Sequence, residues 1–208
     1  MKLYKWITVF ANVSVLVILF MNSETLLEWI KATDNRNLII VLLVITILAS
    51  IPGVPFGIVS GVIGAKYGVT IGVSLSVIAS TLSSVFIYIM FRYLLLQQGN
   101  ILLNKSKTIH RIDHVIKQRI FATIFIARII PIMPAILINI YSGVFGLSFK
   151  LFLIATLLGK IPIMIVYTLI GVNLLSGSKE WIIIAAIYIV FLLSIYSLYR
   201  FFYNKKSI

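Results

Sequence analysis

The sequence predicts an all-α integral membrane protein, an inverted repeat with two re-entrant helical hairpins and about four full transmembrane helices. Three observations carry this prediction. The composition is strongly apolar, the apolar runs are long enough to cross a bilayer, and two of them are broken midway by prolines. Of 208 residues, 61% are hydrophobic and 11% are charged, whereas a soluble domain has roughly 45–50% apolar and about 25% charged residues.

The apolar runs recur along the whole chain, and we expect each to be helical. About 30 Å of hydrocarbon takes roughly 20 helical residues to cross. Backbone groups inside lipid must bond within their own segment, because no water is available to bond them. The segments are Tyr4–Met21, Leu38–Ala65, Val69–Leu96, Ile120–Phe145, Phe149–Leu175 and Trp181–Tyr203.

We expect a single membrane domain over residues 1–208, because no stretch resembles a linker or a soluble appendage. Residues 1–36 would form a first span and an amphipathic helix along the interface. The first span begins like a signal peptide but lacks small residues at a cleavage point, so we expect it to be retained. Residues 38–175 would form the core with the repeats, and residues 181–208 the last span and a basic tail.

Basic residues gather near the N-terminus, between residues 99 and 119, and near the C-terminus. Cytoplasmic loops carry such an excess of Lys and Arg, so these clusters and both chain ends are expected in the cytoplasm. Residues 23–36 then lie outside, and only an odd number of crossings can connect them to residues 99–119, although two apolar segments intervene. A re-entrant hairpin over Leu38–Ala65 restores the parity; a proline-kinked full span is the alternative.

Each half of the chain has a Pro-x-x-Pro break within an apolar segment. Pro52 and Pro55 interrupt the first half, and Pro131 and Pro134 interrupt the second. Proline lacks the backbone donor that continues a helix. These positions therefore predict the tips of two hairpins.

The spacing after the two breaks is also the same. Gly64 lies nine residues after Pro55, and Gly143 lies nine residues after Pro134. With a hairpin in each half, the two halves have opposite orientations. Inverted repeats whose broken helices meet near the midplane are a transporter architecture, and paired Gly/Pro interruptions point to its site.

Several basic side chains fall within apolar segments, whereas the acidic residues, at positions 24, 28, 34, 113 and 180, all lie outside them. Arg92 and Lys66 lie near segment ends, where long side chains reach the interface. Arg128, just before the second break, and Lys160 lie deeper, where unpaired charge is costly. They are expected either to cap carbonyl groups freed by the break or to attract an anionic ligand, and phosphate suits the planar donor fork of Arg.

Motifs of soluble enzymes are missing from the sequence. It contains no cysteine, no phosphate-binding glycine loop, no Ser-His-Asp arrangement and no carboxylate pair at membrane depth. His110 and His114 share a helical face, but only Asp113 could complete a metal site. We therefore expect no enzyme activity, no cofactor and no metal. The net charge of +13 is distributed as in membrane proteins, so nucleic acid is not an expected partner, and basic residues 105–119 are expected to touch anionic headgroups.

Two groups of residues form a recognisable signature. The group in the second half consists of Arg128, Pro131, Pro134, Asn139, Tyr141, Gly143, Gly159 and Pro162. The group in the first half consists of Pro52, Pro55, Gly57, Gly61 and Gly64, with Arg92 ending the following span. Together they resemble the VTT-domain branch of the DedA superfamily, also called SNARE-associated Golgi protein-like, over about residues 38–175.

The resemblance implies two facing re-entrant hairpins and lipid translocation. Eukaryotic relatives resemble phospholipid scramblases, and bacterial relatives are linked to recycling of undecaprenyl phosphate or other lipids. Two departures weigh against proton-driven transport. The DedA branch has a second Arg where this chain has Pro134, and it has acidic residues around the first hairpin, where this chain has none.

We therefore predict a lipid translocase or scramblase whose partners are membrane lipids with anionic phosphate headgroups. It would be a multi-pass protein of a plasma membrane, with a composition that favours a bacterial source. The alternatives are a transporter of a small soluble anion or ion and a non-transporting assembly or structural factor; the lipid and the oligomeric state stay open. The predicted substrate-binding residues are Arg128, Pro131, Pro134, Asn139, Tyr141, Gly143, Lys160 and Arg92. The predicted hairpin-backbone residues are Pro52, Pro55, Gly57, Gly61, Gly64, Gly159 and Pro162.

Overall fold

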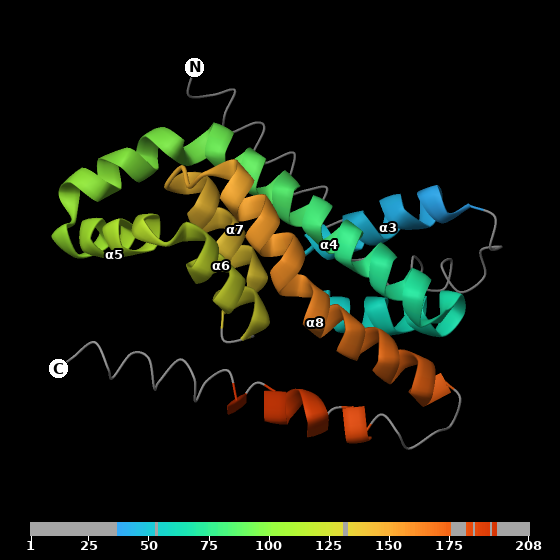
Figure 1. The fold of residues 1–208 in the computed structure, drawn as a ribbon. Coiled ribbons are helices and arrows are strands. Elements are labelled where there is room, and N and C mark those ends of the chain that lie inside the picture. The colour runs from blue at the N-terminus through green and yellow to red at the C-terminus, as the bar shows by residue number, and fades with distance from the viewer. Residues whose placement is uncertain are drawn as a thin grey trace.

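The computed structural model describes residues 37–52, 54–130 and 133–175, and parts of the stretch 182–194 (Figure 1). In the last stretch these parts are 182–184, 186–191 and 193–194. The predicted first span and interfacial helix lie outside the described residues, as does the basic tail, and the last predicted span is described only in part. Every regular element in the described ranges is a helix, as predicted.

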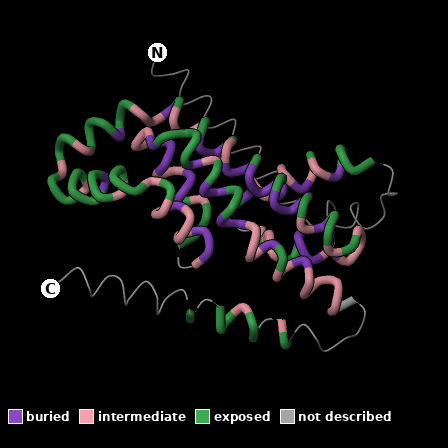
Figure 2. Tube along the Cα trace, in the orientation of Figure 1, coloured by how far each residue is buried: buried purple, intermediate pink, exposed green. Residues whose placement is uncertain are grey.

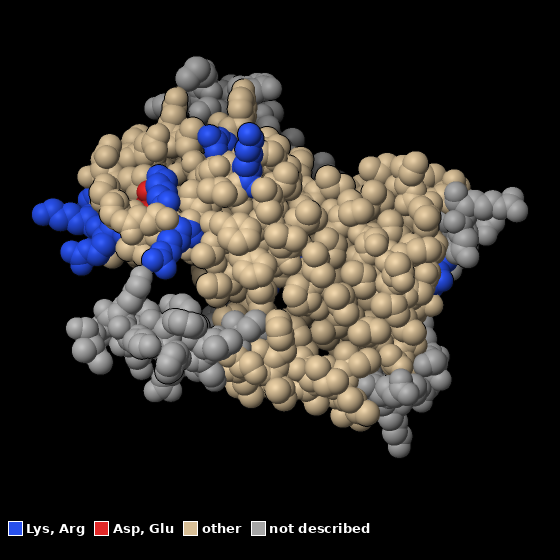
Figure 3. All heavy atoms as spheres, viewed as in Figure 1, with Lys and Arg blue, Asp and Glu red and all other residues tan. Residues whose placement is uncertain are grey.

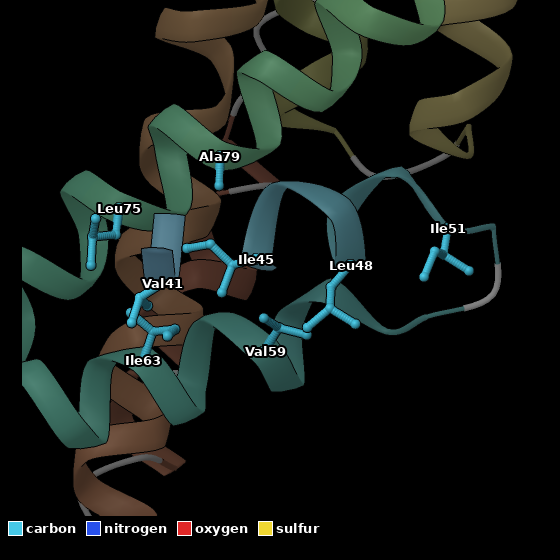
Figure 4. Close-up of a cluster of buried hydrophobic side chains, with 8 residues drawn as sticks. All are labelled: Val41, Ile45, Leu48, Ile51, Val59, Ile63, Leu75 and Ala79. Carbon is cyan, nitrogen blue, oxygen red and sulfur yellow. The ribbon is translucent and has the colours of Figure 1, made fainter. Parts of the chain in front are cut away.

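The first broken segment consists of α3 (Leu38–Ser50) and the start of α4 (Phe56–Lys105). Between them the backbone turns extended at Ile51, which confirms the break predicted at the first proline pair. Buried apolar side chains of the two helices pack together, so the chain doubles back on itself (Figure 4). These side chains are Val41, Ile45, Leu48, Ile51, Val59, Ile63, Leu75 and Ala79. Re-entry of this hairpin into a bilayer stays a prediction.

A second change of direction occurs at Gly68 inside α4. Its φ is +79°, a region that glycine enters without steric cost. The chain folds so sharply there that a Cβ atom on Gly72 would lie 2.7 Å from Cα of Gly64. After this turn the helix continues to Lys105, nine residues beyond the predicted end at Leu96. The predicted end followed the apolar run, but residues such as Gln and Asn in the last turns still permit a helix.

An amphipathic helix, α5 (Lys107–Gln118), joins the two halves. It begins at Ser106, whose Oγ accepts a hydrogen bond from the backbone N–H of Ile109 at 3.4 Å. A serine at this position satisfies a backbone donor that the first helical turn leaves unpaired. The basic stretch predicted to lie in the cytoplasm is therefore helical, and it leads into α6 (Ile120–Ile129).

The second broken segment consists of α6 and α7 (Ala135–Val144), followed by α8 (Phe149–Leu175). Pro134 directly precedes α7, which confirms the predicted break; Pro131 lies outside the described residues. A turn with Gly146 at φ +65° leads into α8. Both halves therefore share one order: helix, proline break, helix, glycine turn and long helix.

Gly159 and Pro162 correct the sequence prediction. The resemblance predicts hairpin backbone at both positions, but both lie inside α8, which runs through them. Proline is tolerated within membrane helices because neighbouring groups bond the carbonyl that it leaves free. Gly159 does not break α8; because it has no side chain, α6 packs closely against α8 at this position.

The helices pack across the two halves through small residues. The start of α4 lies against α8, where a Cβ atom on Gly171 would come within 2.3 Å of Cα of Gly61. In return, α7 lies against α4, where a Cβ atom on Gly143 would come within 2.5 Å of the Tyr88 carbonyl oxygen. Small residues permit such close approach between membrane helices.

Buried residues lie mainly where the helices pack together, and α5 is largely exposed (Figure 2). Two helices, Phe56–Lys105 and Phe149–Asn173, are long and apolar enough to span a bilayer among the described residues. Large apolar side chains project outward, among them Leu43, Ile58, Phe86, Ile89 and Ile154. The interior holds apolar side chains, such as Ile45 and Phe152, and also polar ones, among them Ser60, Ser76, Ser80, Thr156 and Thr168. An apolar exterior that surrounds buried polar groups fits lipid as the surrounding solvent.

Candidate functional site

Arg128 lies in the last turn of α6, and only 6% of its surface is exposed. Its guanidinium group donates hydrogen bonds to neutral oxygens. Nη1 donates to the Ala135 carbonyl at 3.2 Å, and Nη2 donates to Asn139 Oδ1 at 2.5 Å and to Thr156 Oγ1 at 3.3 Å. Nε has no hydrogen-bond partner among the described residues. The positive charge is thus held in place by dipoles and is not neutralised by an acid.

Gly159 of α8 makes room for this arginine. A Cβ atom on Gly159 would lie 2.7 Å from Cβ of Arg128 and 3.1 Å from the Phe125 carbonyl oxygen. The absence of a side chain therefore lets α6 lie close to α8. The ring of Phe152, also on α8, lies 5.9 Å from Cζ of Arg128 and adds a cation–π contact.

Lys160 is a second buried cation, also 6% exposed. Its Nζ donates to the backbone carbonyl of Ser80 and, at 2.7 Å, to Oγ of Ser84. Both partners belong to α4. The lysine therefore connects the long helices of the two halves.

A cavity of about 940 Å³ lies between the two broken segments and α8, and both cations line it. Its size is within the range of roughly 300–1,000 Å³ that ligand pockets occupy. The first broken segment contributes Pro55, Phe56, Gly57, Ile58, Gly61 and Val62. The second contributes Ala127, Arg128, Met133, Pro134, Ala135 and Ile138, and α8 contributes Lys160, Ile163, Met164, Tyr167, Ile170 and Gly171. The walls are thus mainly apolar, with two basic side chains.

A smaller cavity of about 130 Å³ adjoins this region, and Lys160 lines both. Its walls are more polar and include the side chains of Ser80, Ser84 and Asn139, together with Pro52 of the first break. Lys160 therefore stands between an apolar chamber and a serine-rich one.

No acid lines either cavity in the part of the chain that the structure describes. Asp113, on α5, is the one acidic residue in the described ranges. Its carboxylate pairs with Lys117 at 2.7 Å and accepts a hydrogen bond from the Tyr141 hydroxyl at 3.0 Å. Two uncompensated cations in an apolar cavity favour an anion as the ligand, because a buried charge is stabilised chiefly by a counter-charge.

The structure brings together four of the predicted substrate-binding residues: Arg128, Pro134, Asn139 and Lys160. It places Tyr141, Gly143 and Arg92 elsewhere; none of them lines either cavity. Pro131 lies outside the described residues.

The three residues outside the cavities have packing partners instead. Tyr141 points to Asp113, and Gly143 packs on α4. Arg92 donates to the Tyr88 hydroxyl and, at 3.1 Å, to the Leu147 carbonyl. The contacts of Tyr141, Gly143 and Arg92 thus hold α5, α7 and α8 to their neighbours, which gives these three residues of the VTT-like signature a packing role.

Sequence reasoning missed Thr156, Ser80 and Ser84, the neutral partners of the two cations. A signal was present: serines at positions 76, 80 and 84 recur every fourth residue of an apolar helix. This spacing puts them on one face, and a serine stripe within a span indicates a polar interior face.

The Tyr141 hydroxyl is expected to stabilise the junction of α5 and α7. Tyr141→Phe removes the hydrogen bond to Asp113 but keeps the ring contact with Phe145 at 4.6 Å. A hydrogen bond to a charged group contributes about 1.5–3 kcal/mol. We expect that loss in the free energy of unfolding, titrated with sodium dodecyl sulfate in micelles. Tyr93→Phe, at a tyrosine that is 73% exposed, is the matched control; equal stability of the two variants would contradict this role.

The family comparison matches the part of the chain that holds these residues. The VTT domain model matches residues 51–173, a range that contains both breaks, both cations and the cavity lining. Among curated proteins, the uncharacterized protein YqeD of Bacillus subtilis (strain 168) is 24% identical over 191 residues, covering 92% of each chain. No solved structure matches the chain significantly. Because the domain model covers more than half of its length, the chain belongs to the VTT domain family, as the resemblance to the VTT branch of the DedA superfamily predicted.

Proposed function

We propose that this protein moves lipids with anionic phosphate headgroups between the leaflets of a plasma membrane, through the cavity at Arg128. The observation that carries the proposal is the cavity itself. Two buried cations and no acid line it among the described residues, and it lies between the two broken segments. A phosphate group entering it would gain the counter-charge that these cations lack, while the acyl chains remained in lipid.

The chemistry of the lining supports a phosphate ligand. The planar fork of an arginine can donate to two oxygens of one phosphate, and Arg128 lines the cavity. Asn139 and Thr156 hold the guanidinium group in position without neutralising it. Lys160 would supply a second charge to the same headgroup.

The reciprocal packing of the two halves supports an inverted repeat. Gly64, nine residues after the first break, packs on Thr168 of α8. Gly143, nine residues after the second break, packs on Tyr88 of α4. Each broken segment thus packs against the long helix of the other half. Two repeats related by an axis in the membrane plane would pack in this way. Re-entrant hairpins in this arrangement would bring both breaks to the midplane.

The contacts of the two cations also favour a second candidate, a non-transporting structural or assembly role. Arg128 donates to the Ala135 carbonyl and Lys160 to the Ser80 carbonyl, as cations that only cap backbone groups would. The large cavity and the absence of acids from its described lining favour transport, because a purely structural core is packed without such space.

Reconstitution in vesicles tests the proposal. Vesicles of phosphatidylcholine and phosphatidylglycerol would carry a trace of headgroup-labelled phospholipid, and a membrane-impermeant reductant would bleach the outer leaflet. We expect the purified protein to expose inner-leaflet label as well, without an ion gradient. Bleaching that stops at the outer leaflet, as in protein-free vesicles, would overturn the proposal; flux of a small anion without lipid movement would favour a soluble-anion transporter.

A further inference from the structure

A groove separate from the cavity lies at the elbow where α4 ends and α5 begins. It has a volume of about 570 Å³ and is lined by Leu103, Asn104, Lys107, His110, Arg111 and His114. These residues share no position with the lining of either cavity described above. The groove is therefore a distinct candidate site.

The groove is cationic. Lys107 and Arg111 carry positive charge, and the imidazole rings of the two histidines line the groove with them. All four of these side chains belong to exposed residues, and Figure 3 shows the basic side chains gathered over this end of the molecule. Within the described ranges, no acidic residue lines the groove. Its chemistry is complementary to phosphate.

The neighbouring face of α5 identifies the source of that phosphate as a lipid. Ile112 and Val115 are 51% and 61% exposed, and they lie on the same helix as the basic residues. In its last turns α4 also exposes Ile101 and Leu102, and this helix is long enough to span a bilayer. An amphipathic helix with basic residues beside exposed apolar ones lies in the membrane interface.

The orientation of α5 is fixed from within the protein. Asp113, on its buried side, is held by Tyr141 of α7, and Ile116 packs against the core cluster of the second half. Because the buried side of α5 is anchored, the basic residues of the groove stay on the exposed side of this helix.

We propose that the α4–α5 elbow is a second lipid site, which binds the headgroups of anionic phospholipids at the membrane surface. Lys107 and Arg111 pair with the phosphate groups, and Ile112 and Val115 enter the upper acyl region. This site does not involve Arg128, so experiments can support or reject it independently of the proposed translocation.

A single-cysteine experiment tests the site, because the chain contains no cysteine. Val115→Cys is labelled with an environment-sensitive fluorophore and reconstituted in phosphatidylcholine vesicles. These contain, at one mole fraction, either brominated phosphatidylglycerol or brominated phosphatidylcholine as quencher. Basic residues near a surface attract anionic lipid, so we expect phosphatidylglycerol to quench at least about twofold more strongly. The same probe at Ile78→Cys, an exposed position within α4, is expected to show no preference.

Charge variants distinguish the groove from general attraction to a basic protein. Lys107→Gln together with Arg111→Gln is expected to abolish the preference at position 115. Lys66→Gln together with Lys150→Gln removes the same charge outside the groove and is expected to leave it unchanged. Equal quenching by both lipids at position 115, or an equal response to both pairs of substitutions, would overturn the proposal.

Discussion

Arg128→Gln is expected to reduce lipid translocation by about tenfold or more. Hydrogen bonds to charged groups contribute about 1.5–3 kcal/mol, and about 1.4 kcal/mol corresponds to a factor of ten. Glutamine keeps a donor near Asn139 and Thr156 but brings no charge to the cavity. Arg128→Lys is expected to be intermediate, because lysine keeps the charge and loses the planar fork. Initial rates of inner-leaflet bleaching in proteoliposomes measure both effects.

The matched control for Arg128 is Arg92→Gln. It removes the same charge from a residue that lines neither cavity and contacts Tyr88 and Leu147 instead. We expect this variant to lose stability but to keep its translocation rate per folded molecule. Equal activity of the two variants would favour the structural role, in which Arg128 only caps the Ala135 carbonyl.

Gly171→Ala is expected to lower the free energy of unfolding by about 1–3 kcal/mol, the usual cost of overpacking. A Cβ atom there would lie 2.2 Å from the Gly61 carbonyl oxygen and 2.3 Å from Gly61 Cα. Because both are backbone atoms, the start of α4 would have to move away from α8. Gly61 also lines the cavity, so translocation is expected to fall as well. Titration with sodium dodecyl sulfate in micelles measures the loss of stability.

Two further substitutions provide a comparison and a control for this result. Gly143→Ala, at the reciprocal contact of α7 with α4, is expected to cost a similar amount, since its Cβ atom would lie 2.5 Å from the Tyr88 carbonyl oxygen. Ser74→Ala, at an exposed position of α4, is expected to have little effect. If Gly171→Ala were as stable as Ser74→Ala, the contact between the first hairpin and α8 would not hold.

Local backbone chemistry made the breaks of the fold predictable from sequence. The proline pairs beginning at Pro52 and Pro131 interrupt helices whatever surrounds them, and the structure breaks at both places. The turn at Gly68 falls between two predicted spans, because glycine adopts its positive φ without steric cost. By contrast, Pro162 does not interrupt α8, because a lone proline within a long apolar helix lacks the neighbouring breakers that the two hairpin tips have.

Contacts between residues far apart in the sequence were harder to predict from the sequence. The charge of Lys160 and its depth in the span follow from sequence, but its bonds to Ser80 and Ser84 join residues about eighty positions apart. Tyr141 lies two residues from Asn139, and the resemblance to the VTT branch assigned both to the predicted site. On a helix, residues two apart do not face each other, so Asn139 points to Arg128 while Tyr141 points to α5.

Entry of a lipid headgroup into the cavity can be measured directly with two single-cysteine variants. Ile163 lines the cavity, whereas Ile165, two residues along α8, is exposed on its outer face. The two positions differ by about 3 Å in depth at helical rise. A phospholipid with a thiol-reactive group on its headgroup is expected to label Ile163→Cys several-fold faster than Ile165→Cys, and Arg128→Gln is expected to remove the difference. Equal labelling of both positions, or labelling at 163 that does not respond to Arg128, would contradict a headgroup path through this protein.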